Sequence, residues 1–190
     1  MTSHVTSYHA PSIEPKDFLN SSNSEDWFER NSLFPCDDEN DDENDELVYL
    51  PGRRMSRVIA LQVLAEMDVT DHIKDVVLSW LLENNNLDES SGFFASYLVD
   101  SVLDKINEID DSISIYATAW PISQVSIVDR NVLRIAFFEI IFDRDTPYQI
   151  VVSEAVEIAK LFGGDSSPKF VNGVLGALID NEILENSPIF

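Results

Sequence analysis

Beyond residue 50, apolar residues recur at intervals of three and four positions, the spacing that gives an α-helix one buried face. Six such stripes follow one another along the chain: Val58–Ala65, Ile73–Leu81, Phe94–Ile106, Leu133–Ile141, Val151–Phe162 and Phe170–Ile179. The sequence contains no alternating apolar and polar pattern of useful length between them. We therefore predict an all-α fold, because each stripe must be buried against another helix.

Capping residues predict where several of these helices begin and end. Thr70 is a candidate N-cap for the second helix, and Thr146–Gln149 has the pattern of a capping box with proline at the first helical position. Ser167–Pro168 repeats the arrangement of a cap followed by proline, and Gly163–Gly164 predicts the end of the preceding helix. The segment 113–120 is typical of a short helix that leads into a turn.

Acidic residues are distributed unevenly along the 190 residues. Residues 1–50 hold 13 of the 35 acidic side chains and 2 of the 12 basic ones, with eight acids between Asp37 and Glu46. Such a segment cannot bury enough apolar surface to offset the entropy lost on ordering. We predict a disordered acidic arm over residues 1–50 and a folded domain over residues 51–190.

Trp27, Phe28, Leu33 and Phe34 are apolar exceptions within this arm. Two interpretations stay open, because the segment could fold on a partner protein or tether weakly to the chain's own domain. The acidic run ends seven residues before Arg53. A further hypothesis is that the arm competes with other anions for that arginine cluster, and the alternative is that it only keeps the protein soluble.

The patterns typical of enzymes are missing from the sequence. It has no glycine-rich loop that could hold a phosphate, its three histidines are scattered, and Cys36 is its single cysteine, which excludes an internal disulfide. We expect no catalytic site, no cofactor and no metal, and we expect His72 to be an exposed neighbour of a helix start. The N-terminus lacks the basic and apolar regions of a signal peptide, so we expect a cytoplasmic protein.

Three arginines stand close together at the start of the first predicted helix. Arg53, Arg54 and Arg57 are three of the ten basic residues that follow residue 50. Positive charge is unfavourable at a helix N-terminus, where the macrodipole favours acids. A functional interpretation is therefore attractive, in which these guanidiniums pair with phosphates. The alternative is a solubilising flank after a linker.

A second basic position opens the last predicted helix. Lys169 and Phe170 combine a cation with an aromatic ring, which are the groups that hold a phosphate and stack on a base. Phe170 also completes the apolar stripe of that helix, so a purely structural role is the alternative.

Long segments of the chain resemble the NusB transcription antitermination factors. The first helix, RRMSRVIALQVLAEMD, follows the family pattern R-R-x-A-R-x-x-A-x-Q-x-L-Y, and the segments VDRNVLRIAFFE and EAVEIAK…KFVNGVL are specific to this family and to a related domain of rRNA methyltransferases. The resemblance covers roughly residues 52–180. It does not include the arm.

The resemblance implies a bundle of about seven helices in two subdomains that binds RNA and carries out no catalysis. The RNA would be single-stranded and of the boxA type found in rRNA operons, bound together with the ribosomal protein NusE. The complex would join NusA, NusG and RNA polymerase, and the family includes both monomers and homodimers. The alternative is a paralogue that kept the fold as a protein-interaction module with little or no RNA binding.

The resemblance also implies roles for particular residues. RNA contacts carried over from the family are Arg53, Arg54, Arg57, Gln62, Lys169 and Phe170. Asp129 would lie in the face for the ribosomal partner. Internal ion pairs that hold the two subdomains together are expected at Arg134, Glu139, Glu154 and Lys160.

The sequence departs from the family pattern at two positions of the first helix. Ala65 stands where an aromatic residue usually follows Q-x-L, and Ser56 stands where alanine usually separates the arginines. The truncation at Ala65, together with the formal net charge of -23, predicts weaker RNA binding than in a basic homologue.

Overall fold

The computed structural model describes residues 52–85, 87–118 and 121–186, with side chains as far as residue 181. The predicted arm over residues 1–50, with Cys36 and the apolar group Trp27–Phe34, lies outside the described residues. The boundary between the arm and the domain therefore stays a prediction.

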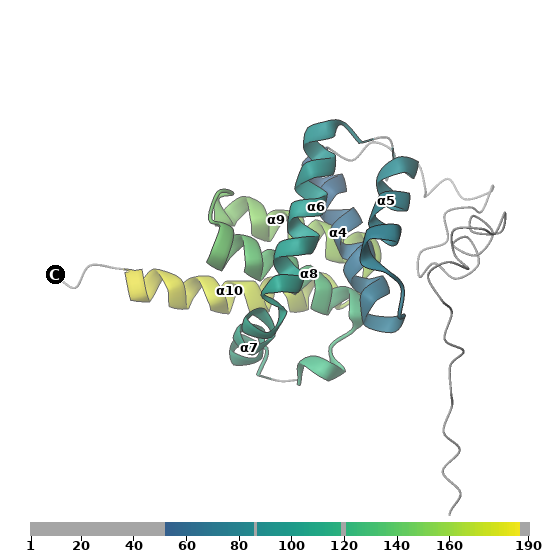
Figure 1. Ribbon diagram of the computed structural model, residues 1–190. Helices are drawn as coiled ribbons and strands as arrows, with labels where there is room; N and C mark the ends of the chain where they lie inside the picture. Colours follow the sequence, from purple (N-terminus) through teal and green to yellow (C-terminus); the bar gives the residue numbers. More distant parts are fainter. Residues whose placement is uncertain (1–51, 86, 119–120, 187–190) are drawn as a thin grey trace, which may run out of the picture. The chain divides into compact units, whose positions relative to one another are not determined.

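The described residues form seven α-helices and contain no β-strand (Figure 1). The helices are α4 (Gly52–Val69), α5 (Lys74–Asn84), α6 (Glu89–Asp104), α7 (Ile106–Tyr116), α8 (Ile127–Phe137), α9 (Tyr148–Phe162) and α10 (Ser167–Asn186). A short 3-10 turn, η1 (Ile122–Gln124), precedes α8, and a π-helical turn, η2 (Phe138–Asp143), extends it. The predicted all-α fold is confirmed.

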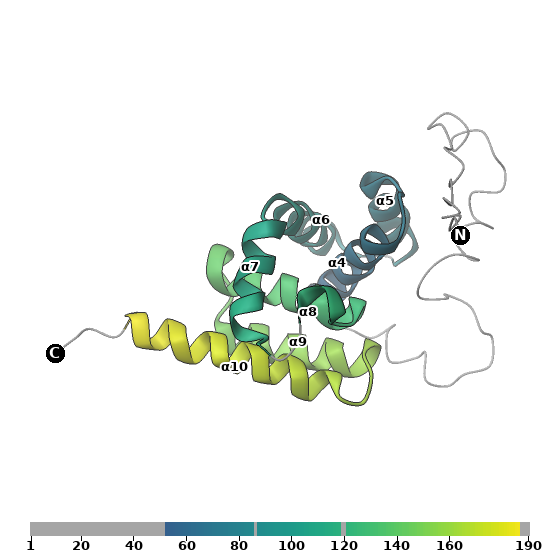
Figure 2. The same cartoon turned by 90° about the horizontal axis from the view of Figure 1, so that it is seen from below.

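The helices pack in two groups that meet through α4 and α8 (Figure 1, Figure 2). In the first group, α4 packs against α5 and α6. In the second group, α8 packs against α7, α9 and α10, and α9 also packs along α10. These two groups are the subdomains that the family resemblance predicts. None of the described helices is both long enough and apolar enough to cross a bilayer.

The apolar stripes form the core, with local exceptions. Each predicted stripe contributes buried residues. Leu61, Leu98 and Phe137 are examples whose exposed fraction is 0%. The stripe of α5 is the weakest, because Ile73 and Val76 are 49% and 36% exposed. Helix α5 is short and packs mainly on α4, so it buries fewer positions than its apolar spacing suggests.

Helix ends differ from the predicted caps at three places. Thr70 caps no helix, since α5 begins at Lys74 and the Thr70 hydroxyl donates to the backbone oxygen of Glu66 at 2.9 Å. Helix α9 has no side-chain cap, so the capping box predicted at Thr146 is wrong. Ser167 is the first residue of α10 rather than its cap, and its Oγ accepts a hydrogen bond from the Gly164 N–H. The predicted end of α9 at Gly163 is confirmed.

His72 is half-buried instead of exposed. Its Nδ1 lies 2.6 Å from a carboxylate oxygen of Glu66, a buried residue in the last turns of α4. The histidine therefore fixes the connection between α4 and α5, a tertiary role that its position near a helix start did not predict.

Candidate nucleic-acid interface

The arginine-bearing turns of α4 are fixed against the start of α6. A Cβ added to Gly52 would lie 2.4 Å from the Ser91 Oγ, so a larger residue here would force the Ser91 side chain to move. The buried hydroxyl of Ser56 lies 2.8 Å from the backbone oxygen of Gly52 and 2.7 Å from that of Ser91. Ser56, a departure from the family pattern, therefore links the two helices in place of an alanine methyl group.

Arg57 points into the protein. Its side chain is 5% exposed, and its Nε and Nη2 donate to the two carboxylate oxygens of Glu139 at 2.8 and 2.6 Å. Glu139 is 0% exposed and lies in the first turn of η2. This bidentate ion pair joins the two subdomains, as expected for Glu139. The pair argues against the predicted phosphate contact of Arg57, because the Nε and Nη2 donors of its guanidinium are already used by Glu139.

Arg54 forms a second bidentate pair across the subdomains. Its Nε and Nη2 each donate at 2.8 Å to a carboxylate oxygen of Glu154 in α9, as expected for Glu154. The hydrogen bond from Arg54 lowers the pKa of Glu154, and the same bond raises the pKa of Arg54. The Arg54 side chain stays 24% exposed, so part of its guanidinium still reaches solvent.

Arg53 is the exposed member of the arginine cluster. Its guanidinium carbon lies 4.1 Å above the centre of the Phe94 ring in α6. A cation over an aromatic face is held in position while its edge remains open to solvent. Of the three predicted phosphate-binding arginines, Arg53 is the one with the most accessible positive charge.

The remaining predicted RNA contacts lie on α4 and α10. Gln62 is half-buried in α4, whereas Lys169 is exposed and Phe170 half-buried in the first turn of α10. Glu157, in the second half of α9, contributes to the raised pKa of Arg54. Helix α9 therefore faces the arginine cluster, and α10 with Lys169 follows it in the chain. The intermediate exposure of Phe170 is compatible with both stacking and packing.

Asp129 is buried in the first turn of α8. It is 9% exposed, and its backbone N–H donates to the Oγ of Ser126, the N-cap of this helix. Its Oδ1 is buried and has no hydrogen-bond partner among the described residues. A buried carboxylate oxygen without a donor is unfavourable, which makes Asp129 unusual in the described part of the chain.

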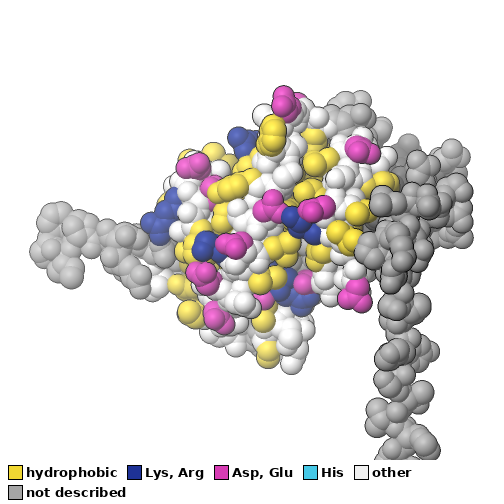
Figure 3. All heavy atoms as spheres, in the orientation of Figure 1, with side chains coloured by type: hydrophobic (Ala, Val, Ile, Leu, Met, Phe, Trp, Pro, Cys, Tyr) yellow, Lys and Arg dark blue, Asp and Glu magenta, His cyan; other side chains and the backbone are white. Residues whose placement is uncertain are grey.

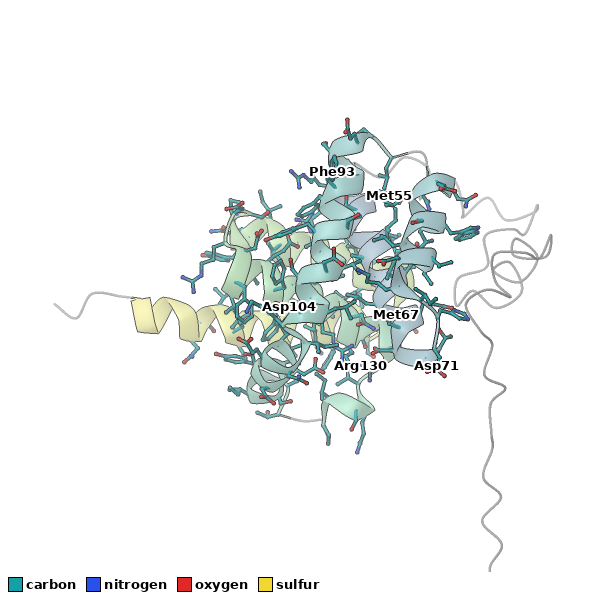
Figure 4. All side chains as sticks on the ribbon, viewed as in Figure 1. Met55, Met67, Asp71, Phe93, Asp104 and Arg130 are labelled. Atoms are coloured by element: carbon teal, nitrogen blue, oxygen red, sulfur yellow. The ribbon has the colours of Figure 1, made fainter. Side chains whose placement is uncertain are left out.

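A polar network that the sequence did not predict lies beside Asp129. Asp68, at the end of α4, accepts hydrogen bonds from Arg130 at 2.8 Å, from Asn131 at 2.8 Å and from Arg134 at 3.0 Å. Arg134 also donates to both carboxylate oxygens of Asp110 in α7, which confirms its expected internal ion pairing. Figure 4 shows Arg130 near the turn between α4 and α5. Arg130 and Arg134 are four residues apart and therefore lie on one helix face, and this spacing could have indicated the network from the sequence.

Burial and hydrogen bonding shift the pKa values of this network in opposite directions. Burial would raise the pKa of Asp68, but the hydrogen bonds from Arg130, Asn131 and Arg134 lower the pKa overall. Burial would likewise lower the pKa of Arg134, but Asp110 and Asp68 raise it overall. The network therefore favours the charged forms of its members. Lys160, the fourth residue expected in an internal pair, is exposed.

Basic side chains form no broad patch on the face shown in Figure 3. There the lysine and arginine side chains lie in small separate groups, several of them beside acidic side chains. Recognition of an anionic polymer on such a surface must depend on a few well-placed contacts, because the Debye length of about 8 Å isolates each group from distant acids.

Comparison with known proteins gives one consistent family. A model of the NusB family matches residues 54–180. The transcription antitermination protein NusB of Dehalococcoides mccartyi (strain CBDB1) is 44% identical over 127 residues, covering 67% of this chain and 89% of that protein. The protein of the same name from Roseiflexus sp. (strain RS-1) is 43% identical over 129 residues, covering 67% and 91%.

Solved structures agree with this match. The structure of T. maritima NusB is similar with a TM-score of 0.63 and 33% identity, covering 72% of this chain and 98% of that chain. A chain from the complex of antitermination factors NusB and NusE with double-stranded RNA has a TM-score of 0.63 and 28% identity, covering 68% and 97%.

Proposed function

The chain belongs to the NusB family, and from that membership we propose that it is a transcription antitermination factor. It binds boxA-type single-stranded RNA of rRNA operons together with the ribosomal protein NusE. The complex then joins NusA, NusG and RNA polymerase. Support comes from the similar chain whose structure contains NusE and RNA.

The observation that carries the RNA part of this proposal is the exposed guanidinium of Arg53 above the Phe94 ring. Arginine binds phosphate through paired N–H donors, and such charge-assisted bonds are stronger than neutral ones. The partly exposed Arg54 and the exposed Lys169 add further positive charge, Gln62 adds a polar contact, and the Phe170 ring adds a stacking face. The protein acts as a scaffold, because it positions these groups and catalyses nothing.

The partner part of the proposal rests on Asp129. NusE docks at the N-terminal turn of α8, the turn that contains Asp129. The Asp129 Oδ1 is buried and lacks a donor among the described residues, so a shift of this turn on docking is needed to bring that oxygen within reach of a donor from NusE.

One observation favours the second candidate function, a paralogue that binds proteins and little or no RNA. Arg57 and Arg54 are both engaged in bidentate ion pairs, which leaves fewer cations for phosphates than the sequence suggests. The net charge of -23 favours the same candidate. The two candidates differ in whether RNA binding depends on Arg53.

Fluorescence anisotropy with a labelled boxA-type single-stranded RNA, with and without NusE, tests the proposal at two salt concentrations. We expect binding that NusE strengthens and salt weakens. Arg53→Ala should weaken it, whereas the matched control Lys160→Ala, which removes an exposed cation from α9, should not. NusE binding with no RNA binding at either salt concentration would support the second candidate instead.

A further inference from the structure

Phe93 is the most exposed of the large hydrophobic side chains in the described part of the chain. It is 69% exposed, while its neighbour Phe94 is 9% exposed. Figure 4 shows Phe93 at the outer end of α6. A single exposed apolar side chain is common on protein surfaces, so its meaning depends on what lies beside it.

The next residue, Phe94, contacts the exposed guanidinium of Arg53. Phe94 holds the Arg53 guanidinium 4.1 Å above its ring, and Arg57 reaches the same ring from 5.4 Å. The close approach of Gly52 to Ser91 and the Ser56 hydroxyl fix the start of α4 against the start of α6. Phe93 therefore stands on the same rigid support as the positive charge of Arg53.

We propose that Phe93 is a base-stacking residue that works together with Arg53. An aromatic face accepts any base, and a neighbouring cation holds the phosphate of the same nucleotide, which is the usual combination in single-strand binding. This inference rests on the proposed RNA binding and adds to it a contact on α6. The sequence motifs on α4 and α10 did not include it.

Helix α6 itself contains no cation that could bind a second phosphate. One helical turn further along α6, the Tyr97 ring packs edge-on against Phe138, and its hydroxyl donates to Asp143 at 2.6 Å. Asp100 follows and binds Lys74 at 2.5 Å. Beyond Phe93 the helix therefore presents a tyrosine whose hydroxyl is already hydrogen-bonded and an acidic side chain, and neither group binds a second phosphate.

The test uses a labelled boxA-type single-stranded RNA and five variants of the full chain in the presence of NusE. Phe93→Ala should weaken binding roughly 5- to 150-fold, the range expected for one stacked base. Phe93→Tyr keeps the aromatic face and should bind normally, whereas Phe93→Leu keeps apolar bulk and should lose affinity. Ile115→Ala, a matched control with 66% exposure on α7, should change nothing.

The salt dependence separates stacking from charge. Phe93→Ala should leave the slope of log K against log salt unchanged, while Arg53→Ala should make it shallower by about 0.7 for one phosphate. If wild type binds RNA and Arg53→Ala weakens it but Phe93→Ala does not, the stacking role is wrong and the proposed function stands. If the wild-type chain binds no RNA, the proposed RNA-binding function itself is wrong. Normal binding by Phe93→Leu would assign Phe93 to an apolar protein contact.

Discussion

The guanidinium of Arg57 and the carboxylate of Glu139 are both buried, and this determines how each responds to substitution. Removing one partner of a buried pair leaves an uncompensated charge, whereas replacing both by apolar residues of similar volume is often tolerated. Arg57 therefore contributes to the fold whether or not it ever meets RNA.

Arg57→Ala should lower the free energy of unfolding by about 3–5 kcal/mol, because Glu139 would stay buried without a partner. Urea denaturation followed by circular dichroism measures this change. The double variant Arg57→Met with Glu139→Leu is the control, and it should recover most of the loss. An Arg57→Ala protein as stable as wild type would show that the ion pair does not hold the subdomains together.

The Phe170 ring is half-buried, so it can pack in the core, stack on a base or do both. Phe170→Leu fills apolar space without a stacking face, so it should leave folding nearly intact and cost about 1–3 kcal/mol of RNA affinity. Thermal unfolding and anisotropy on the same preparation separate the two effects. A variant that unfolds readily but binds RNA normally per folded molecule would assign Phe170 to the core.

Among the elements, α8 carries the greatest number of roles. It packs against α4, α7, α9 and α10, presents Asp129 in its first turn, and continues into the π-helical turn that holds Glu139. Its start is defined by the Ser126 Oγ, which accepts the Asp129 N–H at 3.1 Å. The cap therefore also positions the proposed partner contact.

Ser126→Ala should destabilise the protein by about 0.5–2 kcal/mol, the usual effect of losing an N-cap. Thr146→Ala is the matched control, since the sequence predicts a cap there and α9 has no side-chain cap. It should change stability far less. Equal effects of the two substitutions in urea denaturation would contradict the caps assigned by the structure.

At the scale of the whole molecule, two sets of ion pairs connect the subdomains. Arg54 and Arg57 link α4 to α9 and η2, and Asp68 links α4 to α8. These connections make stability depend on pH, because the carboxylates in them must stay ionised. The pKa of Asp68 and the pKa of Glu154 are both lowered in the folded state.

A carboxylate with a lowered folded pKa contributes stability that is complete above its unfolded pKa and is lost as pH falls through the folded value. The ordinary values are 3.8 for Asp68 and 4.5 for Glu154, so the loss should begin near pH 4.5 and continue below it. Urea denaturation of wild type and Asp68→Asn at pH 7 and pH 3 tests this. The stability difference between the two proteins should shrink at pH 3. A difference that is the same at both pH values would contradict the Asp68 linkage.

Helix content could be predicted from the sequence because apolar spacing is a local property. Val58, Leu61 and Leu64 lie on one side of a helix whatever the helix packs against, and all three are buried. The end of α9 at Gly163 was predicted for the same reason. The α4 and α10 positions of the candidate interface came from the family resemblance, and their RNA contacts stay predictions.

The partners of charged side chains were decided by tertiary structure. Arg57 meets Glu139 across 82 positions, and Arg54 meets Glu154 across 100. The three arginines look alike in the sequence, yet one is buried in an ion pair, one is shared between Glu154 and solvent, and Arg53 is exposed over an aromatic ring. The sequence alone thus determined the helices and their apolar faces, since these depend on neighbours three and four residues away. Only packing between distant helices decided which charges reach solvent, because burial and pairing depend on every element that surrounds a side chain.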